Sequence, residues 1–116
     1  MIADTTVTGF QKNGITVDGQ GSDATITGDT VTGDGAGNAV SNITAQNGIQ
    51  ISRGATAEVS GNAISGNWYT GPSETTACGL LFYQAAGVRQ RANVFSGNQA
   101  DLCNAGRGGG SSDSAS

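Results

Sequence analysis

Apolar residues alternate with other residues in several short stretches of the chain, and these stretches repeat. Three stretches open with a glycine followed by two apolar residues two positions apart, at 14–17, 48–51 and 79–82. Each repeat closes with another apolar residue and a turn, at 29–34, 62–67 and 93–98. A period of two residues is typical of a β-strand with one buried face. The pattern therefore predicts short strands joined by turns, with a degenerate copy at 5–9 and a fragment at 100–102.

The repeats align residue by residue, so equivalent apolar side chains are expected to stack in columns inside the molecule. The first predicted column contains Val7, Val31, Ile64 and Phe95. Two more lie side by side, one with Ile15, Ile49 and Leu80, the other with Val17, Ile51 and Phe82. A third wall is weaker, because Ala24 and Ala57 align with Val88, while Ile26 and Val59 align with the polar Gln90. Such stacking predicts a parallel β-helix with about three full rungs plus partial terminal rungs.

Two polar columns mark the bends. Asp29, Asn62 and Asn93 align, and these residue types bond to nearby backbone groups, so a side-chain ladder is expected there. Gly33, Gly66 and Gly97 form a second column, where either a positive φ or a close approach of backbones is expected. Neither column requires a ligand.

Composition fits this fold and narrows the function. The 116 residues include 20 glycines and one proline, with 12% charged residues, which suits neither a helical bundle nor a charged disordered chain. The net charge of −4 has no basic cluster, so no nucleic-acid partner is expected, and no stretch is apolar enough for a membrane partner. Residues 1–105 are expected to form one β-helix domain, and 106–116 a flexible Gly/Ser-rich tail.

The Gly-Ile-x-Ile motif at 48–51 and the Asn-x-Ile-Ser-Gly-Asn motif at 62–67 resemble repeats of the pectate-lyase-like superfamily. The resemblance covers residues 5 to 104 and implies an all-β, right-handed parallel β-helix (solenoid). It specifies no activity, because lyases, hydrolases, epimerases, phage tailspikes and non-catalytic surface proteins share this architecture.

The repeats are longer than one turn of such a helix needs, since 34 residues separate Asn13 from Asn47. The excess predicts two loops, at 34–46 and 68–76, which leave the same edge and form a candidate functional surface. Trp68 and Tyr69 in the second loop suit sugar stacking, although Trp68 could instead seal the cylinder. Arg89 and Arg91 alternate on one strand and either meet an anionic sugar or form a solvated face. These four residues are the candidate glycan-binding surface.

The sequence contains few of the residues that a lyase or hydrolase site of this superfamily would need. Hydrolase sites of this superfamily use clustered aspartates with histidine and basic residues, and the chain has no histidine. Four of its acids lie on one predicted turn, at Asp18, Asp23, Asp29 and Asp34. Arg53 aligns with Gly19 and so lies one turn above Asp18, where the two side chains could form a salt bridge, or a weak calcium site if further oxygens converge. We therefore assign no catalytic residue, no metal site and no cofactor, and the balance favours a protein that is not an enzyme.

Cys78 and Cys103 are expected on adjacent turns, offset along the strand by about three residues. Slack at 100–101 could remove that offset and allow a disulfide; two buried thiols are the alternative. The disulfide is favoured and indicates a secreted or cell-surface protein.

A β-helix has two open ends, whose strand edges seek partners unless they are capped, and no capping helix is visible in the sequence. We therefore expect either a piece of a longer protein or a homo-oligomer that joins through these ends. The favoured function is a non-catalytic structural or interaction domain of a secreted or surface bacterial protein that binds polysaccharide. The alternatives are a fragment of a polysaccharide lyase or hydrolase, and a trimmed or engineered self-assembling scaffold.

Overall fold

The computed structural model describes residues 1–36, 44–71 and 76–105, and within these ranges the protein consists of strands and contains no helix. The strands form three sheets of four, here called A, B and C. Sheet A contains β1 (Ile2–Ala3), β4 (Asp23–Thr27), β7 (Thr56–Ser60) and β10 (Gly87–Arg91). Sheet B contains β2 (Thr6–Val7), β5 (Thr30–Thr32), β8 (Ala63–Ser65) and β11 (Val94–Ser96). Sheet C contains β3 (Asn13–Asp18), β6 (Asn47–Ser52), β9 (Cys78–Tyr83) and β12 (Ala100–Ala105).

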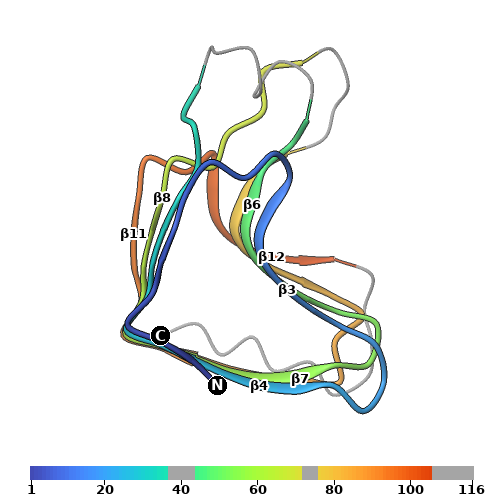
Figure 1. The fold of residues 1–116 in the computed structure, drawn as a ribbon. Helices are drawn as coiled ribbons and strands as arrows, with labels where there is room; N and C mark the ends of the chain where they lie inside the picture. The colour runs from blue at the N-terminus through green and yellow to red at the C-terminus, as the bar shows by residue number, and fades with distance from the viewer. Residues whose placement is uncertain (37–43, 72–75, 106–116) are drawn as a thin grey trace.

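The chain visits sheets A, B and C in turn and then returns to sheet A. Every strand pair within the three sheets is parallel. Seen end on, the sheets form three walls around a common interior, and successive turns superimpose closely (Figure 1). The expected all-β, parallel, solenoid-like β-helix is therefore confirmed. The tail expected at 106–116 lies outside the described residues.

The predicted apolar columns are present in the observed register. In sheet B, Val31 pairs with Val7 on one side and Ile64 on the other, and Ile64 pairs with Phe95. In sheet C, Ile49 pairs with both Ile15 and Leu80, and Ile51 pairs with both Val17 and Phe82. The inner members of these columns are fully buried, and the core is continuous along the axis.

Sheet A extends one strand further than the sequence pattern indicated. Ile2 in β1 pairs with Ile26, so it continues a column that we had begun only at Ile26. At the other end of that column, Gln90 pairs with Val59 and is buried. Its amide oxygen accepts a hydrogen bond from the side chain of Asn93 at 3.1 Å, which explains how a polar residue is tolerated at this position.

The expected polar ladder lies at the bend between sheets A and B. The backbone N–H of Asp29 donates to Oδ1 of Asn62 at 2.8 Å, and the N–H of Asn62 donates to Oδ1 of Asn93 at 3.0 Å. The Nδ2 groups of Asn62 and Asn93 donate to main-chain carbonyls of the preceding turn, at Ile26 and Val59. Each turn therefore satisfies backbone groups of its neighbours, which fixes the spacing of the bend.

At the bend between sheets B and C, the column of Gly33, Gly66 and Gly97 shows both expected properties, a positive φ in two glycines and a close approach of backbones in the third. Gly66 and Gly97 have positive φ angles of 74° and 62°. Gly33 has no positive φ, but a Cβ placed on it would lie 2.5 Å from the carbonyl oxygen of Gly66. A side chain at this position would therefore push two turns apart.

Both long connections leave the cylinder between sheets B and C, as the unequal repeat spacing predicts (Figure 1). They span residues 33–46 and 66–77, whereas the equivalent connections at the two ends of the cylinder span only 8–12 and 97–99. Parts of both loops, 37–43 and 72–75, lie outside the described residues. In the described part of the chain, no helix has the length and apolar character needed to cross a membrane.

Candidate functional site

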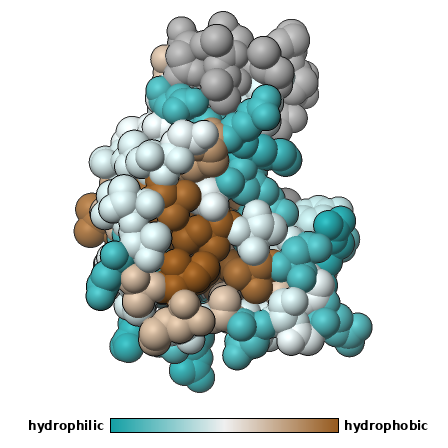
Figure 2. Space-filling view, viewed as in Figure 1, coloured by the Kyte–Doolittle hydropathy of each residue, from teal (hydrophilic) through white to brown (hydrophobic). Residues whose placement is uncertain are grey.

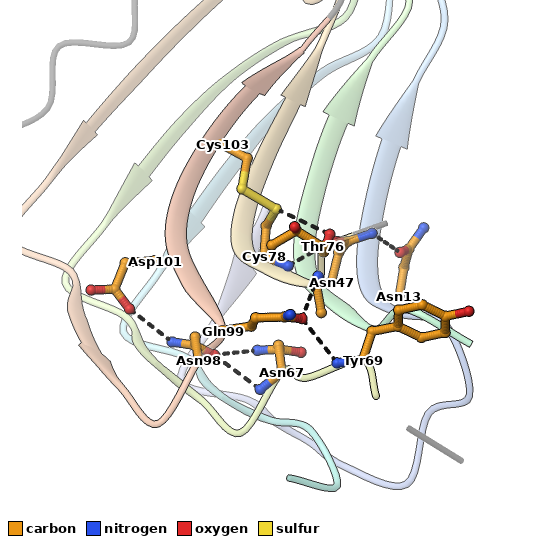
Figure 3. The surroundings of a disulfide bond; sticks show 11 residues. Asn13, Asn47, Asn67, Tyr69, Thr76, Cys78, Asn98, Gln99, Asp101 and Cys103 are labelled. Carbon is orange, nitrogen blue, oxygen red and sulfur yellow. Dashed lines mark hydrogen bonds between the residues drawn. A yellow bond between two sulfur atoms is a disulfide. The ribbon is translucent and has the colours of Figure 1, made fainter. Parts of the chain in front are cut away.

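A disulfide joins β9 to β12, the last strand of sheet C. Sγ of Cys78 is bonded to Sγ of Cys103, and their Cα atoms are 6.0 Å apart (Figure 3). The disulfide expected from the sequence is therefore confirmed, and the alternative of two free thiols is wrong. Disulfides persist in oxidising surroundings, so the bond indicates a non-reducing environment for the protein.

The bond forms without removing the predicted offset between the two cysteines. Cys78 pairs with Ala100 and Cys103 pairs with Leu81, so the strands keep a three-residue stagger. Three residues of straight strand would span about 10 Å. The strands of sheet C curve strongly in this region (Figure 3), and the curvature shortens the distance between staggered positions. Curvature, and not slack in the chain, brings the cysteines together.

The loop edge is held by glutamine and asparagine side chains. Oε1 of Gln99 accepts hydrogen bonds from the N–H of Tyr69 at 3.1 Å and of Ala77 at 3.0 Å, so one side chain joins the two ends of the second loop. Beneath it, Oδ1 of Asn98 accepts bonds from the backbone and side-chain nitrogens of Asn67. Figure 3 shows these residues together below the disulfide.

The first loop is held in a similar way. Oε1 of the fully buried Gln46 accepts from the N–H of Asp34 at 2.9 Å, while its Nε2 donates to the carbonyl of Phe10 at 2.8 Å. Sequence reasoning missed Gln46 and Gln99, because the aligned positions on the other turns hold Lys12 and Ala77 and no column is apparent.

Trp68 and Tyr69 lie at the base of the second loop, and both are half-buried. In Figure 3 the Tyr69 ring extends towards the side on which Asn13 lies, while its backbone N–H is bound by Gln99. The half-burial of Trp68 fits either role considered from the sequence, sugar stacking or sealing of the cylinder.

Arg89 and Arg91 lie elsewhere, on the outer face of β10 in sheet A. Both are exposed, and they alternate with the buried Val88 and Gln90, as expected for one face of a strand. Arg89 pairs in register with Glu58. The four residues of the predicted glycan surface therefore divide into two regions, one at the loop edge and one on sheet A.

A hollow of about 410 Å³ lies over the outer face of sheet A. It crosses three strands and is lined by Asp23, Ala24, Thr25, Thr56, Ala57, Glu58, Gly87, Val88 and Arg89. Thr56 donates from its hydroxyl to the Asp23 carboxylate at 2.7 Å, which fixes one side of the hollow. Within the part of the chain that the structure describes, no hydrogen bond or ion pair engages the side chains of Glu58 and Arg89.

The hollow follows from the register of three repeats. Thr25, Glu58 and Arg89 occupy one outward column, and Asp23, Thr56 and Gly87 occupy the next. Gly87 lacks a side chain and opens the second column beside Arg89. Sequence reasoning identified Arg89 but missed its neighbours, although the same alignment that located the core also places them side by side.

Asp18 and Arg53 form a salt bridge, which was one of the two possibilities considered from the sequence; the other was a weak calcium site. Arg53 donates to both carboxylate oxygens, at 3.0 and 3.1 Å, and the hydroxyl of Ser52 donates to Oδ1 at 2.6 Å. These hydrogen bonds, first from Arg53 and then from Ser52, lower the pKa of the Asp18 carboxyl. Among the described residues, no three His, Cys, Asp or Glu side chains gather to hold a metal ion.

The hollow is the candidate functional site, because it combines a concave surface with a free carboxylate, a free guanidinium and threonine hydroxyls. Such groups donate and accept hydrogen bonds with a hydroxyl-rich ligand. The chain matches no protein-family model, no curated protein and no solved structure.

Proposed function

We propose that this protein is a non-catalytic interaction domain of a secreted or cell-surface bacterial protein, and that it binds polysaccharide in the hollow on sheet A. The observation that carries the proposal is the pairing of Glu58 with Arg89 across that hollow, with neither side chain engaged by another described residue. Free charged groups on a rigid sheet are ready to bind a ligand without a prior rearrangement.

The handedness and type of the β-helix can also be inferred. We infer a right-handed parallel β-helix of the pectate-lyase-like type, with about three full rungs and partial ones at the ends. The parallel sheets, the asparagine ladder and the short terminal strands β1 and β2 support this inference. The Cys78–Cys103 disulfide supports an extracellular location.

A sugar chain suits the chemistry of the hollow. The Glu58 carboxylate accepts hydrogen bonds from sugar hydroxyls, and Arg89 donates to ring, hydroxyl or carboxylate oxygens. The floor at Ala24 and Ala57 consists of strand backbone, because the side chains of these two residues belong to the interior core. Binding spread over three strands favours an extended oligosaccharide over a single sugar.

The test is a glycan array, followed by calorimetric titration of any oligosaccharide that binds. Arg89→Ala and Glu58→Gln are each expected to weaken binding about tenfold, since a hydrogen bond to a charged group contributes roughly 1.5–3 kcal/mol. Arg91→Ala is the comparison, because Arg91 has the same charge, strand and face but does not line the hollow.

The outcomes separate three possibilities. Equal losses for Arg89→Ala and Arg91→Ala would assign binding to a general basic strip and contradict a site in the hollow. A loss confined to Trp68→Ala would move the site to the loop edge. Cleavage of a bound polymer, detected as new reducing ends or unsaturated products, would contradict the non-catalytic assignment.

A further inference from the structure

The interior of the cylinder is incompletely covered at both ends. Seven apolar residues pack against the core while remaining partly exposed, and six of them belong to the first or last turn: Ile2, Val7, Phe10, Val17, Phe95 and Leu102. Figure 2 looks onto the end formed by β1, β2 and β3, and an apolar surface occupies its centre. The ends therefore expose side chains that equivalent residues bury in the inner turns.

The strand edges at these ends also lack partners within the described residues. β1, β2 and β3 form one edge of their sheets, and β10, β11 and β12 form the other. Because all pairs are parallel, the same pattern can be continued only by strands that run in the same direction. The last turn of a second copy presents such strands to the first turn.

We propose that copies of this chain associate head to tail, with β10, β11 and β12 of one copy placed against β1, β2 and β3 of the next. In this arrangement, each apolar column of one copy meets the same column of the next copy. The column that ends at Phe95 begins at Val7, and the column that ends at Leu102 begins at Ile15. Stacking would thus continue both columns across the junction and bury the partly exposed ends.

The charges at the two ends are complementary in the same register. Ala3 occupies the outward column of sheet A that ends at Arg91, and Asp4 follows Ala3. Across a head-to-tail junction, Ala3 of one copy therefore lies opposite Arg91 of the other, and Asp4 is the diagonal neighbour of Arg91. The Asp4 carboxylate lies against Gly28 of its own copy, so the exposed Arg91 side chain has to reach across the junction to meet it. A head-to-head junction brings together two first turns, or two last turns, and forms no such pair.

The two long loops do not lie at the ends of the cylinder. The long connections belong to the inner turns, while the end connections at 8–12 and 97–99 are short. Neither end of the cylinder therefore carries a long loop at the corner between sheets B and C. Since a head-to-tail contact does not close on itself in a straight cylinder, it produces open chains of increasing length.

The test uses the full chain in sedimentation velocity across a wide dilution series, with electron microscopy of the most concentrated sample. We expect the mean mass to increase with concentration beyond a dimer, and short rods of constant width to appear. A monomer at all concentrations, or a plateau at a dimer, would overturn the proposal.

A charge swap tests the polarity of the contact. Asp4→Arg and Arg91→Glu are each expected to weaken association about tenfold, because each replaces an attraction by a repulsion. The double variant is expected to recover association. An arginine is compatible with position 4, because Arg53 adopts the same left-handed backbone conformation, with φ 50° against 53° at Asp4.

Glu58→Lys is the matched control, since it changes an acid to a base in the middle of sheet A, away from both ends. It is expected to leave association unchanged. Circular dichroism of each variant confirms the fold before association is compared. Failure of the double variant to recover, with all variants folded, would contradict the head-to-tail arrangement.

Discussion

Asp29 is the ladder residue whose substitution should stabilise the protein. Its side chain is buried, with an exposed fraction of 1%, and its Oδ2 has no hydrogen-bond partner among the described residues. On the next two turns, the equivalent atoms are the Nδ2 groups of Asn62 and Asn93, which donate to carbonyls of the preceding turn at 3.1 and 2.9 Å. Asp29→Asn should extend this series, with a new bond to the carbonyl of Ile2, which pairs with Ile26.

The magnitude follows from three contributions. The new hydrogen bond contributes about 1 kcal/mol, and removing a buried unpaired oxygen contributes about 1–3 kcal/mol. Against these, Oδ1 of Asp29 accepts from the N–H of Thr5 at 2.7 Å, and this bond weakens by roughly 1 kcal/mol when an amide oxygen replaces the carboxyl oxygen. The expected net gain in unfolding free energy is about 1–3 kcal/mol, with a rise in Tm of roughly 4–8 °C for each kcal/mol.

The assay is urea unfolding at neutral pH, where the midpoint should rise while the slope m stays constant. Asn62→Asp is the mirror control. It replaces an Nδ2 that donates to both Ile26 and Asn93 by an oxygen that faces the same two acceptors, so a loss of about 3 kcal/mol is expected. An Asp29→Asn protein that is equally or less stable than the parent would refute the reasoning about the ladder.

Three further predictions concern the glycine column of sheet C, the disulfide and the salt bridge. Gly48→Ala should destabilise the protein by about 3 kcal/mol or more in urea unfolding, because a Cβ there would lie 2.7 Å from a carbonyl oxygen of the next strand; a change within experimental error would contradict this. Reduction of Cys78–Cys103, which closes a loop with a sequence separation of 25, should lower the unfolding free energy by about 3.5 kcal/mol, measured with and without reductant; an unchanged midpoint with free thiols would count against it. The pKa of Asp18 is lowered from its ordinary value of 3.8, so the salt bridge should stabilise the protein above that pH and cease to do so as the pH falls through the lower folded-state pKa. The Tm difference between the parent and Arg53→Ala should therefore shrink below about pH 4. A difference that stays constant with pH would contradict the assignment.

The core was predictable from the sequence because its determinants are periodic. Val31 and Ile64 belong to repeats that align residue by residue, and a shift of one residue would place one of them on the outer face. Ile2 was missed because β1 contains only two residues, too few to show an alternation.

The hollow on sheet A was harder to predict, because it depends on side-chain size at outward positions, where the repeats differ. Thr25, Glu58 and Arg89 share a column but not a residue type, so the alignment places them together without indicating a site. The approach of Cys78 to Cys103 across a three-residue stagger depends on the curvature of the sheet C strands (Figure 3), which the pattern of apolar residues does not indicate.

The close packing of glycines from turn to turn limits how a chain like this can change in length. Gly48 lies against the carbonyl of Gly79, and the bends bond side chains of one turn to the backbone of the next, so adding one residue to a strand would misplace every contact above it. A whole repeat, such as the 31 residues from Asn47 to Cys78, preserves these contacts. We therefore expect natural relatives to differ by complete turns or by the length of the two corner loops, and to conserve strand length within each turn.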